Sequence, residues 1–140
     1  MRKFGAPESI VSSYQHWYVL LRPWQVTLGS LIVIAREAVT AWPQLSAGAF
    51  TELHQVTADL ENTLQQAFGY EKINYLMLMM VDPDVHFHVI PRYSGTRIFA
   101  DCEFIDAGWP GPPRLDSVNA ADQGAILAQL HDTLTRHWPQ

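Results

Sequence analysis

Two histidines and an aspartate alternate with apolar residues in the stretch VDPDVHFHVIPRY, residues 81–93. In a strand, side chains two residues apart lie on the same face, about 7 Å apart, so Asp84, His86 and His88 are expected to share one face. The opposite face, predicted to be buried under a helix, consists of Val85, Phe87 and Val89. A neutral imidazole is a nucleophile at pH 7, and a second imidazole can donate a hydrogen bond to a phosphoryl oxygen. The pattern therefore favours nucleophilic histidine chemistry at phosphorus.

Two other interpretations of the same residues stay open. The polar face could simply be solvated. Alternatively, His-x-His on a strand is suitable spacing for two metal ligands, and a metal site would need a third ligand from elsewhere in the chain. His16 and His54 are candidates for the third ligand only by default, because no motif around either residue indicates a metal ligand.

The rest of the chain predicts strands and helices that are segregated rather than alternating. Runs rich in apolar and β-branched residues predict strands, at 17–21, 30–35, 73–80, the histidine stretch and, more weakly, 97–105. The first two form a hairpin, and the run at 73–80 (INYLMLMM) is apolar on both faces, as in a central strand. Its methionines are expected to fill the core. The prediction is an α+β domain with an antiparallel sheet of about five strands and two main helices.

The two helices are marked by their ends and by their apolar stripes. Ser46 is a suitable N-cap and Gly69 a suitable C-terminal stop for a helix over about 47–68, with Phe50 in its stripe and in a hydrophobic staple with Leu45. Asn119 is expected to cap the second helix. The apolar stripe of that helix contains Ile126, Leu127, Leu130, Leu134 and Trp138.

Composition limits the class of protein. The 140 residues, 48% hydrophobic and 16% charged, predict one globular domain over 1–140. The formal charge of −5 argues against nucleic acid as a partner. Cys102 is the only cysteine, which excludes an internal disulfide and a cysteine-rich zinc site. Without an apolar signal core or a run of 18 apolar residues, the sequence predicts a cytoplasmic protein with no membrane partner.

The stretch DVHFHVIPR, 84–92, resembles the motif of the histidine triad family of nucleotide hydrolases and transferases, in which three histidines alternate with apolar residues on a strand. His86 matches the middle histidine and His88 the third, whereas Asp84 stands in the place of the first. LLRPWQVTLGSLIVIA, 20–35, is similar to the upstream hairpin of the family, with Ser30 where the family has a supporting histidine.

This resemblance implies a hydrolase for a nucleoside phosphate linkage, either in a dinucleoside polyphosphate or in a nucleoside phosphoramidate. His86 would attack the α-phosphate and form a covalent nucleotidyl-His86 intermediate, and His88 would contact the phosphate. The alternative is a nucleotide-binding or sensing module with little turnover. No metal or other cofactor is required, although magnesium can arrive with a polyphosphate. The resemblance also implies a homodimer.

Further residues are candidates by their place in the resemblance. Arg22 lies near the place where the family contacts the ribose, and Ser30 lies where the family has the histidine that supports the triad. Arg92 begins a basic turn that could hold distal phosphates, and Trp17 could form part of a base pocket, although an aromatic residue on a strand is more often core. Asp84 could merely fill a missing histidine's place, but the expectation is that its carboxylate orients an imidazole or a water molecule.

Overall fold

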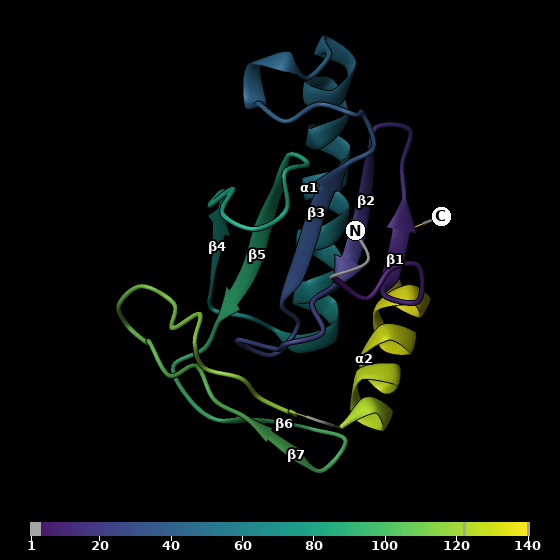
Figure 1. The fold of residues 1–140 in the computed structure, drawn as a ribbon. Helices are drawn as coiled ribbons and strands as arrows, with labels where there is room; N and C mark the ends of the chain where they lie inside the picture. Colours follow the sequence, from purple (N-terminus) through teal and green to yellow (C-terminus); the bar gives the residue numbers. More distant parts are fainter. Residues whose placement is uncertain (1–3, 122, 140) are drawn as a thin grey trace.

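A computed structural model of the protein describes residues 4–121 and 123–139. Its centre is a five-stranded sheet in which all neighbouring strands are antiparallel (Figure 1). In spatial order the strands are β1 (Ile10–Ser13), β2 (Trp17–Leu21), β3 (Leu31–Ala35), β5 (His86–Arg92) and β4 (Lys72–Leu76). With two helices on one face of this sheet, the predicted α+β class is confirmed.

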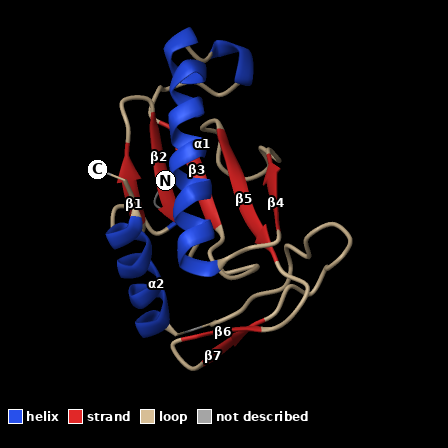
Figure 2. Ribbon diagram, turned by 180° about the vertical axis from the view of Figure 1, so that it is seen from behind, coloured by secondary structure: helices blue, strands red, loops and turns tan. Residues whose placement is uncertain are grey.

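Helix α1 (Ala47–Phe68) runs across the back of the sheet (Figure 2). Its predicted ends are confirmed. The side chain of Ser46 accepts a hydrogen bond from the backbone N–H of Ala49, and Gly69 adopts a left-handed conformation with φ 60°. Phe50 is an exception, because it is 38% exposed and packs against Trp42 instead of entering the core. The prediction that Phe50 belongs to the buried stripe was therefore wrong.

Helix α2 (Gly124–His137) packs on the same side of the molecule, against α1 and β1. Its predicted stripe is buried at Ile126, Leu130 and Leu134. The predicted cap is wrong, because the helix begins five residues after Asn119. The amide Nδ2 of that residue instead donates to the backbone carbonyls of Gln25, Val26 and Ile105 at 3.0–3.1 Å.

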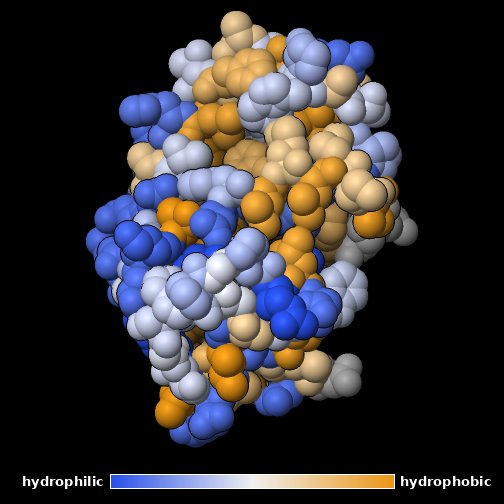
Figure 3. Space-filling view, turned by 90° about the vertical axis from the view of Figure 1, so that its left-hand side faces the viewer, coloured by the Kyte–Doolittle hydropathy of each residue, from blue (hydrophilic) through white to orange (hydrophobic). Residues whose placement is uncertain are grey.

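The predicted central strand at 73–80 is instead the edge strand β4 followed by an exposed loop. The chain leaves the extended conformation after Leu76, and Met79 has a φ of 54°. Met80 and Val81 are 82% and 72% exposed, so the expectation that the methionines fill the core was wrong for Met80 and for the 38%-exposed Met77. Figure 3 views the molecule from the β4 side, where apolar surface gathers in the upper half.

The number of strands in the main sheet was predicted correctly, but their identity was not. The sequence prediction did not include β1, and the weak strand expected at 97–105 is a separate hairpin of β6 (Arg97–Phe99) and β7 (Cys102–Phe104). This hairpin lies at the lower end of the molecule in Figure 1. No helix in the described part of the chain is long and apolar enough to cross a membrane.

The two faces of the sheet are buried in different ways. The helical face forms the main core, in which side chains of β2, β3 and β5 meet the buried stripe of α1. The other face carries a small second cluster, made of Phe4, Leu20, Ile32 and Ile34. The histidines of β5 lie on this second face, beside a segment near the N-terminus rather than under a helix.

Candidate functional site

The two histidines of β5 lie side by side on the face of the sheet away from α1. In the register with β3, His86 is opposite Ile34 and His88 is opposite Ile32, and both isoleucines belong to the second cluster. The imidazole centroids are 5.3 Å apart with the ring planes at 79°. The intervening Phe87 is 6% exposed on the helical face. The predicted division of the strand into a buried apolar face and a histidine face is confirmed.

The ring of His86 is oriented by the main chain. Its Nδ1 lies 2.8 Å from the backbone carbonyl oxygen of Asp84. A carbonyl oxygen can only accept, so Nδ1 is the donor, and in the neutral tautomer that this bond selects Nε2 keeps its lone pair. This is the tautomer that a nucleophilic imidazole needs when Nε2 attacks an electrophile.

Asp84 therefore orients His86 through its backbone, whereas the expectation assigned that role to its carboxylate. The strand begins only at His86, so Asp84 lies in the preceding turn, where its backbone N–H donates to Oδ1 of Asp82 at 2.8 Å. A residue outside the strand does not follow the alternation of the strand. The contacts of Asp84 in this turn are thus made by its backbone N–H and carbonyl, and the role expected of its carboxylate stays a prediction.

His88 is held neutral by its surroundings. Burial lowers the pKa of His88 to about 4, and the positive charge of Arg22 and the neighbouring His86 contribute to the shift. Its Nδ1 is buried and has no hydrogen-bond partner among the described residues. At neutral pH this ring has one N–H to donate, which suits a contact with a phosphoryl oxygen.

A pocket of about 300 Å³ opens over the two imidazoles. Its floor is the histidine pair, and Phe4 packs against both rings with centroid distances of 5.5 and 6.4 Å. The remaining lining residues come from three separate segments and are Arg22, Trp24, Leu78, Met80, Val81 and Leu115. A concave, mostly apolar pocket with a few polar groups at its base is typical of a small-molecule site.

Arg22 is the one predicted nucleotide-binding residue that lines this pocket. It follows β2 directly, and its Nη1 donates to the carbonyl of Trp24 at 2.6 Å. Its Nε is buried and without a partner among the described residues, and burial lowers the pKa of the guanidinium. Such an unpaired donor costs free energy unless a ligand accepts from it. Arg22 is therefore placed to bind an anion next to His88.

Ser30 and Trp17 lie outside the pocket. Ser30 is fully buried, and its Oγ donates to the carbonyl of Thr27 at 2.8 Å, so it closes the turn before β3. Trp17 is fully buried on the helical face, where its Nε1 donates to the carbonyl of Ala49 at 2.8 Å. The ordinary explanation for an aromatic residue on a strand, core packing, accounts for Trp17.

Arg92 lies on the histidine face, but at the other end of β5. Its guanidinium forms two hydrogen bonds with Asp106, at 2.7 and 3.1 Å, and donates to Asn74 and to the carbonyl of Gly111. The ion pair is buried, and it holds the segment after β7 against the sheet. The position of Arg92 indicates a structural role, and it is not among the residues that line the histidine pocket.

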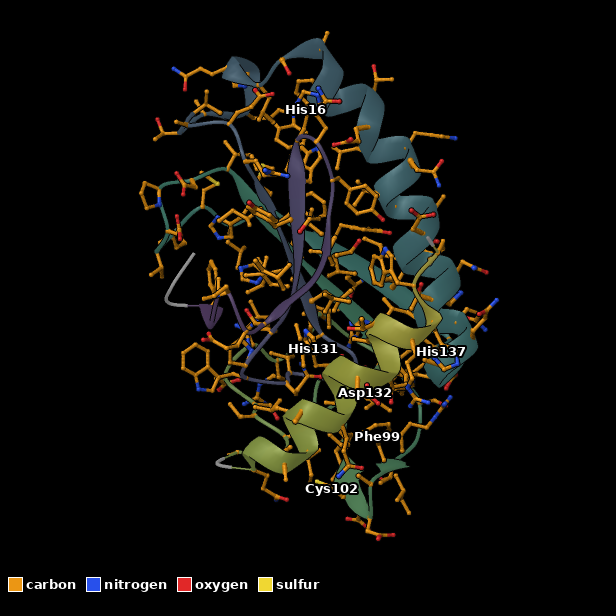
Figure 4. All side chains as sticks on the ribbon, turned by 90° about the vertical axis from the view of Figure 1, so that its right-hand side faces the viewer. His16, Phe99, Cys102, His131, Asp132 and His137 are labelled. Carbon is orange, nitrogen blue, oxygen red and sulfur yellow. The ribbon has the colours of Figure 1, made fainter. Side chains whose placement is uncertain are left out.

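The alternative of a metal site finds no third ligand among the residues that the structure describes. Figure 4 places His16 at the far upper end of the molecule, where its Nδ1 lies 3.1 Å from Glu37. His54 is exposed on α1, behind the sheet. Within residues 4–121 and 123–139, no group of three or more histidine, cysteine, aspartate or glutamate side chains is arranged to hold a metal ion.

Sequence reasoning missed most of the pocket wall. Phe4, Trp24 and Leu115 are far apart in the sequence, and only the folded topology brings them to the histidines. Met80 and Val81 could have been found, since they directly precede the turn Asp82-Pro83, and such a turn places its neighbours in a loop.

Known structures with the same arrangement identify the fold. A histidine triad protein from Marinobacter aquaeolei superposes with a TM-score of 0.76 at 21% identity, over 99% of this chain and 93% of that one. A second, from Bradyrhizobium japonicum, has a TM-score of 0.74 at 18% identity, over 93% and 90% of the two chains. The chain has the histidine triad fold.

A third structure, from Sulfolobus tokodaii, is that of a hypothetical histidine triad nucleotide-binding protein. It superposes with a TM-score of 0.68 at 16% identity, over 92% of this chain and 82% of that one. The sequence itself matches no protein-family model and no curated protein. The resemblance of residues 84–92 to the family motif and the likeness of the whole fold agree on the histidine triad fold.

Proposed function

We propose that this protein is a nucleotide hydrolase that cleaves a nucleoside phosphate linkage, in a dinucleoside polyphosphate or a nucleoside phosphoramidate, through a covalent nucleotidyl-His86 intermediate. The observation that carries the proposal is the hydrogen bond from Nδ1 of His86 to the backbone of Asp84. In the neutral ring this bond directs the proton to Nδ1, so that the lone pair of Nε2 is available in a pocket that also contains a neutral imidazole and a guanidinium.

The reaction has two steps at one phosphorus atom. Nε2 of His86 forms a bond to the α-phosphorus as the bond to the leaving group breaks, and the leaving group departs with the electron pair and takes up a proton. Water then attacks the same phosphorus, which releases the nucleoside monophosphate and restores the imidazole. His88 and Arg22 stabilise the charge that develops on the phosphoryl oxygens, by donating from His88 and from the unpaired Nε of Arg22.

Intact-mass measurement tests the proposal. Wild type incubated with a dinucleoside polyphosphate or a nucleoside phosphoramidate should gain the mass of one nucleoside monophosphate, and His86→Ala should not. His86→Ala should also lose turnover while melting near the wild-type temperature, because the ring packs against Phe4 of the small second cluster rather than in the main core. Retention by this variant of more than a tenth of the wild-type rate would refute the nucleophile assignment.

The second candidate is a nucleotide-binding or sensing module with little turnover. The specific observation in its favour is Asp84 in the place of the first triad histidine, which removes one imidazole from the polar face. This module would bind nucleoside monophosphate tightly in calorimetry and form neither adduct nor product. The same incubation therefore separates the two candidates.

We further propose that the protein works as a cytoplasmic homodimer without a bound cofactor, and that magnesium enters only with a polyphosphate substrate. Support for the dimer comes from β4, an edge strand whose Tyr75 and following Met77 are 39% and 38% exposed. These two residues line an apolar pocket between β4 and α1, and an exposed apolar edge favours pairing with another chain. Light scattering that gives the mass of one chain would contradict the dimer.

A further inference from the structure

The turn between β2 and β3 is closed from inside by the side chain of Gln25. This residue is fully buried and lies outside the lining of the histidine pocket. Its Nε2 donates to the backbone carbonyls of Arg22 and Ser30 at 2.7 and 3.0 Å. Its Oε1 accepts from the backbone N–H groups of Gly29 and Ser30 at 2.9 and 3.2 Å. These four bonds use the two donors and the two lone pairs of one carboxamide.

The backbone of Arg22 is fixed at both of its polar groups by this arrangement. Its N–H donates to the carbonyl of Ser30 at 3.0 Å, and its own carbonyl accepts from Gln25. The guanidinium in turn donates to the carbonyl of Trp24, and both side chains line the pocket. After burial, the charge of Arg22 is the next cause of the lowered pKa of His88, which places the guanidinium close to that ring.

The chemistry of the turn requires a carboxamide at this position. The side chain must donate to two carbonyls and accept from two N–H groups, whereas a carboxylate only accepts and an apolar side chain would remove all four bonds from a buried turn. The backbone of Gln25 is anchored as well, because its carbonyl accepts from the N–H and from Nδ2 of Asn119 at 2.8 and 3.1 Å. Gln25 therefore joins the backbone of Arg22 to the segment that precedes α2.

We propose that Gln25 is a positioning residue, which fixes the turn that carries Arg22 and so holds the guanidinium beside His88, where both contact the phosphate of a nucleotide. The inference deepens the proposed function and rests on it for the identity of the ligand. Because Gln25 lies outside the pocket lining, its effect on the site passes through Arg22. Substitutions at these two positions should therefore not be additive.

Two substitutions and their combination test this assignment. In Gln25→Met the pKa of His88 should rise above about 4 in an NMR titration, because the guanidinium is no longer held beside the ring. The affinity for adenosine 5′-monophosphate, measured by calorimetry, should fall at least tenfold. Arg22→Met should show both changes. Adding Gln25→Met to Arg22→Met should weaken binding less than twofold further and leave the pKa of His88 where Arg22→Met puts it.

Tyr14→Phe is the control for the loss of a buried hydrogen-bonded group elsewhere. The hydroxyl of Tyr14 donates to Asp59 on α1 and accepts from Nε1 of Trp138, both at 2.7 Å. This variant should unfold at a lower urea concentration and keep both the pKa of His88 and the affinity for the monophosphate. If Gln25→Met does not fold, Gln25→Asn takes its place. Its carboxamide is one methylene shorter, and binding should weaken at least threefold.

Additive effects at the two positions would overturn the inference, as would the wild-type pKa of His88 together with the wild-type affinity in a folded Gln25 variant. The NMR titration needs no ligand, so its result does not depend on the hydrolase function. A non-additive pair in a protein that forms no adduct at His86 would support the positioning role and refute the hydrolase. Wild type that does not bind the monophosphate would refute both.

Discussion

Replacing His88 with asparagine should remove part of the acid sensitivity of the fold. Burial, Arg22 and His86 lower the pKa of His88 to about 4 in the folded protein, from 6.5 in the unfolded chain. Between these two values the unfolded chain binds a proton that the folded protein does not bind. The free energy of unfolding therefore falls as the pH falls from about 6.5 towards 4. This direction is opposite to that of a histidine stabilised by a carboxylate.

The size of the effect follows from the two pKa values. At pH 4.5 the linkage relation gives a loss of about 2.5 kcal/mol from this one side chain relative to pH 7.5. That loss is a large share of the 5–15 kcal/mol that typically stabilises a domain. In His88→Asn the loss is absent, while the contributions of the carboxylates remain.

Urea unfolding of wild type and His88→Asn at pH 7.5, 6.5, 5.5 and 4.5 measures this difference. The gap between the two free energies of unfolding should shift in favour of the variant by about 2.5 kcal/mol over the series, with most of the shift below pH 6.5. His137→Asn is a control, because His137 lies on the exposed end of α2. Parallel pH curves for wild type and His88→Asn would refute the account of His88 as a buried neutral base.

Four further substitutions test other parts of the structure. Arg22→Met should raise the pKa of His88 above about 4 in an NMR titration, because a neighbouring positive charge is lost; an unchanged pKa would place the guanidinium elsewhere. Asp84→Asn should keep kcat/KM within about threefold of wild type, since the backbone carbonyl holds His86; a hundredfold loss would restore a role for the carboxylate. Phe87→Asp should give insoluble or unfolded protein, because it buries a charge under α1, and a normal melting curve would contradict the face assignment. Asn119→Ala should lower the free energy of unfolding by about 2 kcal/mol, since backbone carbonyls lose their donor.

The parts of the fold that were predictable are those in which a local pattern determines the answer. The alternation across β5 assigned Phe87 and the histidines to opposite faces, because neighbouring side chains of a strand cannot share a face. Helix α1 was predictable within a residue, because a capping serine and a left-handed glycine mark its two ends. Neither prediction needed knowledge of a distant contact.

The predictions that failed are those that relied only on the apolar character of a segment or residue. The run at 73–80 has the composition of a buried strand, yet the chain leaves the sheet after Leu76, and the exposed side chains of Leu78 and Met80 line the histidine pocket. Trp17 was offered as a pocket residue, although which face of β2 meets α1 depends on the pairing of three strands. The pocket also includes Phe4 and Leu115, which line it together with the histidines of β5. No local sequence pattern predicts such contacts between distant segments.

The contact between α2 and β1 has a consequence for synthesis on the ribosome. Nε1 of Trp138 donates to the hydroxyl of Tyr14 at 2.7 Å, and an imidazole nitrogen of His131 lies 2.7 Å from the carbonyl of Ile10. Strand β1 is synthesised first, and the helix that packs against it, α2, is synthesised more than a hundred residues later. At about 5–20 residues per second, the nascent sheet waits on the order of 10 s with the side chains of β1 uncovered. During that interval β1 and the apolar surface beside it are open to chaperones, so slower translation of the C-terminal part should lower the yield of soluble protein before it alters the stability of the finished fold.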